Sequence, residues 1–428
     1  MATFIGLIMN SKCQQTLYMK MKLLTVVMLS SSLVLTACGG SDDSSYTSKP
    51  SIPENNFKNP VVGMPVAYTE TDFSAFASES SVMTYKMLGQ NGKETLATSL
   101  IFVPKGTMPS GGWKVVVWAH GTTGVADQCA PSRNATNIYI QDMINKFLAA
   151  GYIVVAPDYE GLGEPSGREL HPFLNVKSEA YSITDAVVAA RSYLASQGKV
   201  LSRQWVTVGH SQGGQAALGA AQYASRAKLE YKGTVAVAPA SNLGAILVKG
   251  EQSVENAPIA QQIQMYAQLD TFTALITAGI RNLQPTFNYI NVFKSPTDEI
   301  ASRAELDCYD QVGQKFGAAM QTYAFTNGSL ANYPRTQINF MAIPLVKTFL
   351  ENDSQPAQVK LSQPALIYQG GKDTTVPREA TDGLVLLARS KGSKIQYFTD
   401  AEWDHGTAYV LNISNIVNDV KTLMPASN

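Results

Sequence analysis

The chain has 428 residues, of which 45% are hydrophobic and 15% are charged, enough apolar material for a large buried core. Its 33 basic and 33 acidic side chains give a formal net charge of zero. This charge balance gives no reason to expect nucleic acid or another polyanion as a partner, and the length allows one large domain or up to about three smaller ones.

The N-terminal residues carry the first recognisable pattern. Lys20 and Lys22 precede the apolar run LLTVVMLSSSLVLTA, which is too short to span a membrane comfortably and ends at Cys38. A basic flank, a short apolar core and small residues before a break are typical of a secretory signal. We therefore predict a signal peptide over residues 1–37, with the natural start at Met19 or Met21.

The residues around Cys38 add a second feature to this signal. Leu35-Thr36-Ala37-Cys38 resembles the lipobox of bacterial lipoproteins, and this resemblance implies cleavage before Cys38 and attachment of lipid to it. An ordinary signal peptide, or an N-terminal membrane anchor with Cys38 incidental, is the alternative. The polar stretch that follows predicts a flexible tether over residues 38–58. We expect a globular domain over residues 59–428, anchored to a membrane of the bacterial cell envelope through lipidated Cys38, or secreted if Cys38 is not lipidated.

Strand and helix patterns alternate from Trp113 onward. Short apolar runs at 114–120, 152–159, 204–210 and 233–240 predict buried strands, and helical patterns at 137–151, 178–198 and 213–227 lie between them. Ser178 is the expected N-cap of the second helix, and Gly198 its end. This alternation predicts an α/β fold with a mostly parallel central sheet and helices on both faces. The run at 95–104 predicts an antiparallel edge strand.

The alternation stops after Ala240 and resumes at 364–373. Residues of about 241–362 are mostly helical in pattern, with apolar side chains that recur near helical spacing: Ile259, Ile263, Tyr266, Leu269, Phe272, Ile276 and Ile280. Such a stripe is typical of core packing, but a helical insertion between late strands commonly covers a site, and we predict a cap here. Beyond Asp373 we expect a helix at 378–392, a strand at 394–399 and a last helix ending near Met424.

One short motif points to chemistry. Ser211 lies in GHSQG, a G-x-S-x-G sequence between a predicted strand and a predicted helix, which is the context that a nucleophile elbow requires. The turn strains the serine backbone, and Gly209 and Gly213 permit the close approach of the two elements. The serine would then lie at a helix N-terminus, where developing negative charge is favoured. The alternative is a tight turn with a buried serine.

A serine hydroxyl needs a base to accept its proton, and the chain holds four histidines. His210 adjoins Ser211 and must point away from it, His120 opens the loop after the first core strand, and His171 lies in a loop as a structural or pocket residue. His405 follows the last predicted strand and is therefore our choice for the general base.

The orienting acid should follow a strand and lie between the serine and the histidine in the chain. Asp373, in YQGGKD, meets both conditions. Asp404 adjoins His405 and can rarely reach that ring, whereas Asp400 and Glu402 are weaker alternatives. Asp373 would hold the tautomer of His405 and stabilise the imidazolium.

A tetrahedral intermediate also needs hydrogen-bond donors. The backbone amide of Gln212, the residue after the predicted nucleophile, is one. The loop His120-Gly121-Thr122-Thr123-Gly124 is in place for the other, and we favour the Thr122 amide over that of Gly121. The alternative reading of this loop is a flexible turn.

Together these motifs resemble the α/β-hydrolase superfamily from about residue 60 onward. HGTTG, APDYEGLGEPSG, GHSQGGQAA, GGKDTTVP and WDHG resemble the secretory lipase family, the lipase A group. The resemblance implies a lipase or esterase that hydrolyses a carboxylic ester through an acyl-enzyme, with Ser211, Asp373 and His405 as the triad and a helical cap. The same triad also serves peptidases and amidases, and a non-catalytic surface lipoprotein is the remaining alternative.

The sequence contains four cysteines. Cys13 leaves with the signal, and Cys38 would be lipidated, so Cys129 and Cys308 remain as a pair that we expect to be bridged in an exported protein. Neither HExxH nor a Cys/His cluster occurs in the sequence, and we expect no metal or other cofactor.

Overall fold

The structure, a computed structural model, describes residues 51–426. The predicted signal peptide, Cys38 and most of the predicted tether lie outside this range. No helix within residues 51–426 combines the length and apolar character needed to cross a bilayer.

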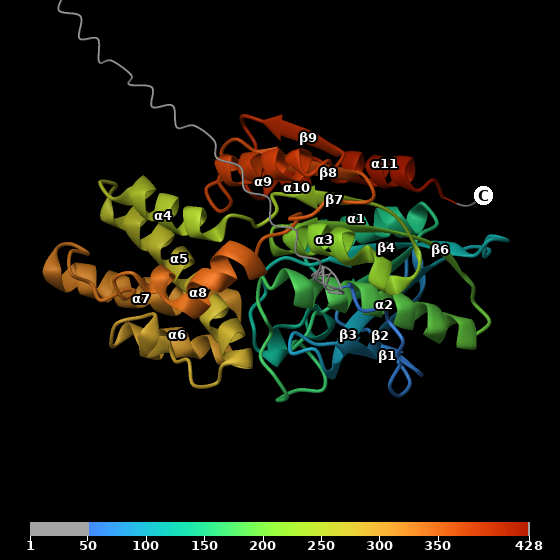
Figure 1. The fold of residues 1–428 in the computed structure, drawn as a ribbon, viewed down its shortest axis with the longest axis horizontal. Helices are drawn as coiled ribbons and strands as arrows, with labels where there is room; N and C mark the ends of the chain where they lie inside the picture. The colour runs from blue at the N-terminus through green and yellow to red at the C-terminus, as the bar shows by residue number, and fades with distance from the viewer. Residues whose placement is uncertain (1–50, 427–428) are drawn as a thin grey trace, which may run out of the picture. The chain divides into compact units, whose positions relative to one another are not determined.

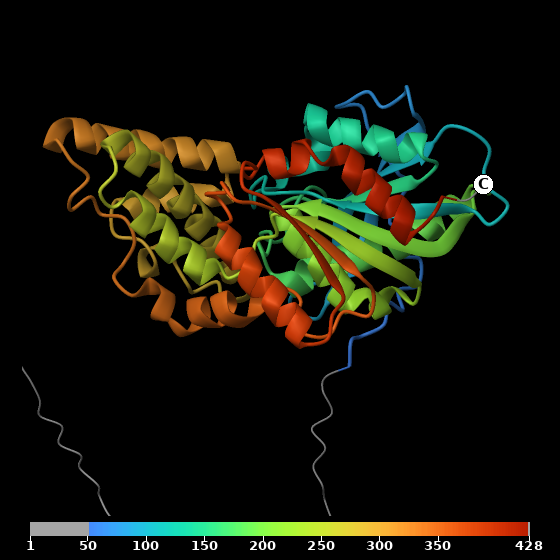
Figure 2. The ribbon, with the colours of Figure 1, turned by 90° about the horizontal axis from the view of Figure 1, so that it is seen from above.

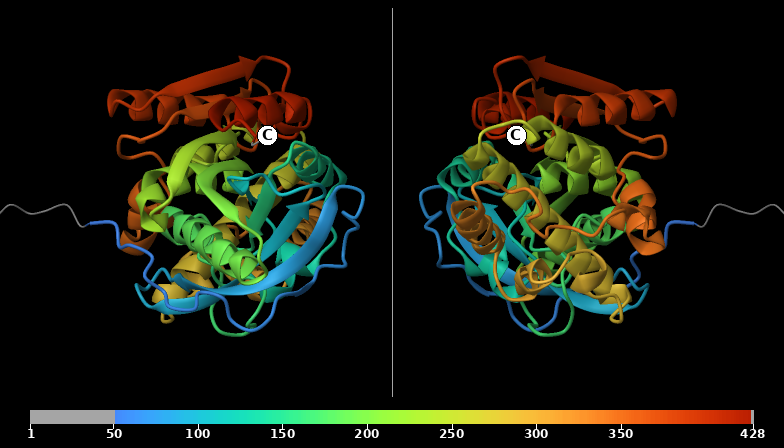
Figure 3. Two further views of the ribbon diagram at one scale, coloured as in Figure 1. Left: turned by 90° about the vertical axis from the view of Figure 1, so that its right-hand side faces the viewer. Right: turned by 90° about the vertical axis from the view of Figure 1, so that its left-hand side faces the viewer.

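The described residues form a nine-stranded sheet in the order β1-β2-β3-β5-β4-β6-β7-β8-β9 (Figure 1). Strands β4 to β9 pair in parallel, and β1, β2 and β3 add an antiparallel edge. The strands are β1 (Val66–Ala67), β2 (Ala77–Leu88), β3 (Glu94–Pro104), β4 (Trp113–Ala119), β5 (Ile153–Pro157), β6 (Leu201–His210), β7 (Glu230–Val237), β8 (Ala365–Gly370) and β9 (Ile395–Asp400). Figure 3 shows the long strands β2 and β3 at one edge and β9 at the other.

Helices cover both faces of this sheet, as the alternating pattern predicts. Helices α2, α3 and α9 contribute to the core on one face, and α1, α10 and α11 to the core on the other. Their bounds are α1 (Ile138–Ala149), α2 (Val176–Ser196), α3 (Gln212–Tyr223), α9 (Arg378–Ser390), α10 (Thr407–Val410) and α11 (Ile413–Leu423). Strands β4 and β5 are buried almost throughout, which explains their continuous apolar runs.

The start of α2 differs from the prediction. Ser178 is not the N-cap: the helix begins at Val176, and the side chain of Asn175 accepts a hydrogen bond from the Ser178 amide at 3.0 Å. Asparagine caps helices as well as serine does, and the two candidates lie within one turn. Local sequence alone therefore did not distinguish them.

The globular unit begins at Ile52, earlier than the expected tether boundary at residue 58. Residues before that boundary bind to a buried ion pair between Arg226 and Asp185. Arg226 donates to the Pro53 carbonyl at 2.7 Å, and the side-chain amide of Asn55 donates to Asp185 at 2.8 Å. These polar contacts order a segment that has too little apolar surface to fold alone.

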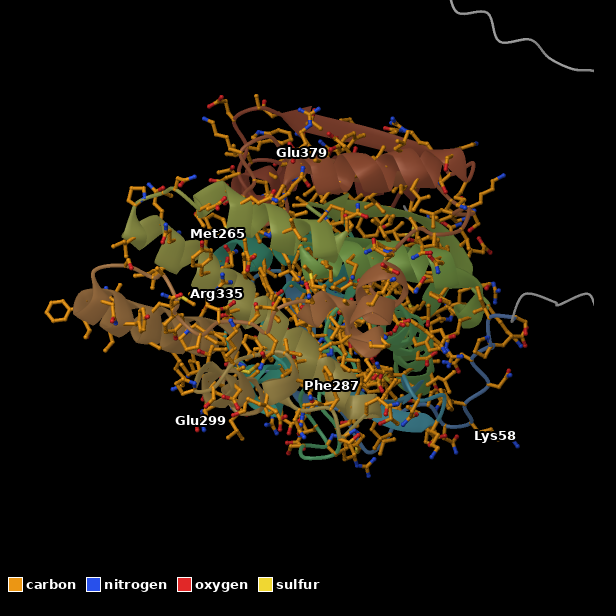
Figure 4. The ribbon with its side chains drawn as sticks, turned by 60° about the vertical axis from the view of Figure 1, so that its left-hand side comes forward. Lys58, Met265, Phe287, Glu299, Arg335 and Glu379 are labelled. Atoms are coloured by element: carbon orange, nitrogen blue, oxygen red, sulfur yellow. A yellow bond between two sulfur atoms is a disulfide. The ribbon has the colours of Figure 1, made fainter. Side chains whose placement is uncertain are left out.

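The segment between β7 and β8 is helical, and we refer to residues 241–362 as the cap. It contains α4 (Leu243–Val254), α5 (Ile259–Leu283), α6 (Thr297–Ser302), α7 (Tyr309–Asn327) and α8 (Pro344–Thr348). The cap helices gather at one end of the sheet in two perpendicular views (Figures 1 and 2), and their hydrophobic core also includes Phe173, Leu174 and Val376 from outside the cap. Arg335, labelled in Figure 4, ties the α7–α8 connection to α5 through an ion pair with Asp270 at 2.7 Å.

Candidate active site

Ser211 lies in a strained turn between β6 and α3. Its φ of 59° and ψ of −121° are rare for a residue with a side chain, and such a backbone costs about 1–3 kcal/mol. The Ser211 amide donates to the Val237 carbonyl at 2.9 Å, and the Ser211 carbonyl accepts from Ala240 at 3.2 Å. The neighbouring strand β7 and the residues after it thus hold the turn in place.

Two glycines make this turn sterically possible. A Cβ atom at Gly209 would lie 2.1 Å from the carbonyl oxygen of Gly213, and one at Gly213 would lie 1.9 Å from that of Ala119. Both clashes are with backbone atoms, so no side-chain movement relieves them. The structure therefore gives a steric reason for both glycines of the G-x-S-x-G sequence.

His405 and Asp373 are hydrogen-bonded partners. The Nδ1 atom of His405 lies 2.8 Å from Oδ2 of Asp373, whose side chain is fully buried, while 21% of the histidine side chain is exposed. The other carboxylate oxygen, Oδ1, accepts from the amides of Thr375 at 2.9 Å and Val376 at 2.8 Å. The Asp373 carboxylate is thus fixed by its own loop and directed at the ring.

The glycines before Asp373 bring its loop close to the loop that carries His405. A Cβ atom at Gly370 would lie 2.3 Å from the Trp403 carbonyl oxygen, and one at Gly371 would lie 2.8 Å from Cα of Ala401. The Lys372 amide also donates to the Trp403 carbonyl at 2.8 Å. The absence of side chains at these two glycines therefore permits the close approach of the two loops.

The other acids considered for His405 have different partners. Asp404 accepts from the Thr407 amide at 2.7 Å, Asp400 accepts from the Glu402 amide at 2.7 Å, and Glu402 pairs with Lys372.

Ser211 and His405 line one cavity of about 740 Å³, which we call the cleft. Gly121, Thr122 and Thr123, from the loop after β4, line it too. This loop lies next to the nucleophile turn: a Cβ atom at Gly121 would be 3.4 Å from the His210 carbonyl oxygen and 4.0 Å from Cβ of Ser211. Gln212 is the first residue of α3, so its amide has no acceptor within the helix.

Three further histidines lie close to this site: His120 and His171 are buried, and His210 is half-buried. Burial, together with the neighbouring His405, lowers the pKa of His210 to about 3, and its Nε2 bonds to the His405 carbonyl at 2.8 Å. Burial also lowers the pKa of His120, whose ring stacks on Tyr159. These histidines are neutral near pH 7, and their hydrogen bonds fix surrounding loops.

A buried polar network behind Ser211 was not found by the sequence analysis. The side-chain amide of Gln212 donates to Glu179 Oε1 at 2.7 Å and to His171 Nε2 at 2.9 Å. Because the Glu160 carbonyl can only accept from His171 Nδ1, at 2.8 Å, Nδ1 carries the proton and Nε2 is the acceptor. Burial raises the pKa of Glu179 to about 8 and lowers that of His171 to about 3. No sequence signal distinguished Glu179 from the exposed acids that open many helices.

The predicted disulfide is present between Cys129 and Cys308. It joins the loop after β4 to Cys308, the N-cap of cap helix α7, and Cys308 also pairs with Gly124 through the backbone. The Tyr309 amide donates to the Thr123 carbonyl at 2.9 Å. The cap is therefore attached directly to the loop that lies against Ser211.

Within residues 51–426, no three His, Cys, Asp or Glu side chains gather as a potential metal site.

The sheet order, the strained serine turn and the cap define an α/β-hydrolase with a cleft under a helical insertion. The sequence profile of the family described as secretory lipase matches residues 131–421. The chain belongs to this secretory lipase family and is a carboxylic ester hydrolase.

Solved structures of similar proteins agree with the fold. An esterase, LipA from Xanthomonas oryzae described as rice cell wall degrading, has 19% identity and a TM-score of 0.65, over 86% of this chain and 98% of that one. Candida antarctica lipase A in its closed state has 16% identity and a TM-score of 0.65, over 86% of this chain and 82% of that one. A putative hydrolase from Legionella pneumophila has 16% identity and a TM-score of 0.65, over 85% and 98%. A comparison with curated protein sequences finds no match.

Proposed function

We propose that the chain hydrolyses carboxylic esters through an acyl-enzyme on Ser211, with His405 as general base and Asp373 as the acid that orients it. The observation that carries the proposal is the 2.8 Å hydrogen bond from His405 Nδ1 to Asp373, with His405 and Ser211 on one cleft. A proton held on Nδ1 leaves Nε2 as the basic nitrogen.

In the proposed first step, His405 Nε2 takes the hydroxyl proton of Ser211 as Oγ attacks the ester carbonyl carbon. The amides of Gln212 and Thr122 donate to the resulting oxyanion, an interaction that strengthens as charge develops. The imidazolium, stabilised by Asp373, then gives its proton to the leaving alcohol oxygen, and the acyl-enzyme remains. Water then attacks the acyl carbonyl carbon while His405 takes its proton, and the bond to Ser211 Oγ breaks as His405 returns that proton to Oγ and the acid is released.

The buried network supports this arrangement from behind. Since Glu179 and His171 hold the side chain of Gln212, its backbone amide keeps a fixed position next to Ser211. On the other side of Ser211, the disulfide between Cys129 and Cys308 holds the loop that contains Gly121 and Thr122 against the cap.

The test is hydrolysis of p-nitrophenyl esters by the globular unit, Ile52–Asn428, and by its Ser211→Ala variant. We expect ester hydrolysis by the unchanged domain and a loss of about 10⁶-fold in kcat in the variant. If anilides or peptides were cleaved and no ester were, the peptidase alternative would replace the proposal. Full activity in the variant would exclude Ser211 as the nucleophile.

We further propose that the chain is lipid-anchored at Cys38 after export. The lipobox resemblance supports the anchor, and both the secretory lipase family and the Cys129–Cys308 bond support export. Expression of a Cys38→Ser variant tests the anchor. We expect it to move from the membrane fraction to the soluble fraction, and unchanged membrane association would contradict lipidation.

A further inference from the structure

Two cavities of very different size meet at Ser211. The cleft has a volume of about 740 Å³, and a second cavity, which we call the slot, has about 40 Å³. Four residues line both: Thr122, Ser211, Phe272 and Thr375. The nucleophile thus lies on the boundary between a wide space and a narrow one.

The slot runs from Ser211 into the cap, and its walls are apolar. Its lining includes Leu243, Ile246 and Leu247 of α4, Phe272 and Ile276 of α5, and Phe173 and Leu174 from the segment before α2. Beyond it, Leu247 and Ile276 also line a cavity of only about 10 Å³. A water-sized group needs about 10–15 Å³, so this space does not extend the slot by a useful length.

The chemistry assigns the two halves of an ester to the two cavities. His405 lines the cleft but is not among the slot residues, and Gln212 lines the slot but is not among the cleft residues. In the proposed reaction, His405 protonates the leaving alcohol, so the alcohol must leave on the side of the cleft. The acyl chain would then bind in the slot, which Gln212 lines.

We propose that this enzyme selects esters with a short acyl chain and a bulky alcohol part, and that Phe272 is the residue that sets the limit. This inference rests on the proposed function. The slot, at about 40 Å³ against about 740 Å³ for the cleft, is by far the narrower of the two spaces beside Ser211. We therefore expect it to hold a short acyl chain such as butyryl and to exclude one as long as octanoyl.

Phe272 is held as a fixed partition between the two cavities. Its ring stacks on that of Tyr309, with centroids 5.5 Å apart and an interplanar angle of 22°. Tyr309 follows Cys308 directly, so the disulfide fixes its position against the core. A longer acyl chain would therefore have to displace a supported ring.

The decisive test uses two isomeric esters, octyl butyrate and butyl octanoate, which have the same atoms with the ester group reversed. We expect octyl butyrate to have at least a tenfold higher kcat/KM, since each excluded methylene in such a pocket changes the rate by about tenfold or more. Equal rates, or faster hydrolysis of butyl octanoate, would overturn the proposal. Hydrolysis of neither ester, nor of any p-nitrophenyl ester, would instead reject the proposed function itself.

Two substitutions test the role of Phe272. Phe272→Ala should join the slot to the cleft and raise kcat/KM for butyl octanoate relative to octyl butyrate by about tenfold or more. Phe325→Ala is the control, because Phe325 is also a cap phenylalanine but is 92% exposed and lines neither cavity. Ile276→Phe should have the opposite effect and reduce butyrate hydrolysis relative to acetate. An unchanged ratio in both folded slot variants would overturn the assignment of Phe272.

Discussion

The Nδ1 atom of His405 lies 2.8 Å from Oδ2 of Asp373, and the aspartate is also fixed by amides of its own loop. The carboxylate therefore has a single orientation relative to the ring. A negative group in that place favours the tautomer with a basic Nε2 and stabilises the imidazolium that forms during catalysis.

Replacing this acid should impair the chemistry with little effect on folding. We expect Asp373→Asn to lower kcat by about 10⁴-fold with a small change in KM, because the amide favours the wrong tautomer. Asp404→Asn is the matched control: the Asp404 carboxylate accepts from the amide of Thr407 at 2.7 Å and from its hydroxyl at 2.8 Å, and kcat should stay near the unchanged value. A larger loss in Asp404→Asn than in Asp373→Asn, measured by steady-state kinetics, would reverse the assignment.

Gly213, the second glycine of the G-x-S-x-G sequence, gives a prediction about stability. Gly213→Ala places a Cβ atom 1.9 Å from the Ala119 carbonyl oxygen, a clash with backbone that we expect to cost more than about 3 kcal/mol of unfolding free energy. In Gly244→Ala the nearest atom is 4.0 Å away, so the variant should gain about 0.5–1 kcal/mol from lower entropy of the unfolded chain. Urea unfolding of both variants measures the difference, and similar stabilities would contradict the steric account.

Most of the fold could be predicted because its elements have strong local patterns. The buried strands β4, β5, β6 and β7 appear as apolar runs, and the lapse after Ala240 coincides with the helical segment between β7 and β8. The predicted N-cap of α2 was wrong because Asn175 and Ser178 are both good caps and lie only three residues apart. The ordering of Pro53 and Asn55 depends on Arg226, far away in the chain, and no local pattern reveals it.

The candidate site could be predicted where a motif joins a residue type to a strand end. Ser211, Asp373 and His405 each follow a strand, and parallel strands bring such positions to the same edge of the sheet. Glu179 and Phe272 could not be found in this way. Their positions depend on how α2 and the cap pack, and their local sequences resemble an ordinary helix start and an ordinary core stripe.

Removing the disulfide should affect both stability and activity. The bond closes a segment of 179 residues, and its loss in Cys129→Ser/Cys308→Ser should lower the unfolding free energy by about 2–5 kcal/mol. Because Cys308 also pairs with Gly124 next to Thr123, kcat for a p-nitrophenyl ester should fall as the loop loosens. Dithiothreitol should reproduce these effects in the unchanged protein and have none on the double variant. Unaltered thermal unfolding in both cases would contradict a stabilising role.

The carboxyl group of Glu179 gives a prediction of pH dependence. Burial raises its pKa from the ordinary 4.5 to about 8, so between these values the folded protein holds a proton that the unfolded chain has lost. The free energy of unfolding must then fall as pH rises through this window, by up to about 1.4 kcal/mol per unit. The nearby groups are His171, 3.8 Å away and neutral, and Tyr159, whose pKa burial raises well above its usual range.

Glu179→Gln tests this account, because glutamine keeps an oxygen that accepts from Gln212 but cannot lose a proton. We expect the variant to become progressively more stable than the unchanged protein between pH 5 and pH 8, as measured by urea unfolding, while its kcat at pH 7 stays similar. Glu255→Gln, at an exposed cap position, should follow the unchanged protein at every pH. Glu179→Ala removes the acceptor for the Gln212 side chain, so its kcat should fall with little change in KM. Parallel stability curves for Glu179→Gln and the unchanged protein would show that Glu179 is ionised in the folded state, and that the network holds Gln212 through a carboxylate.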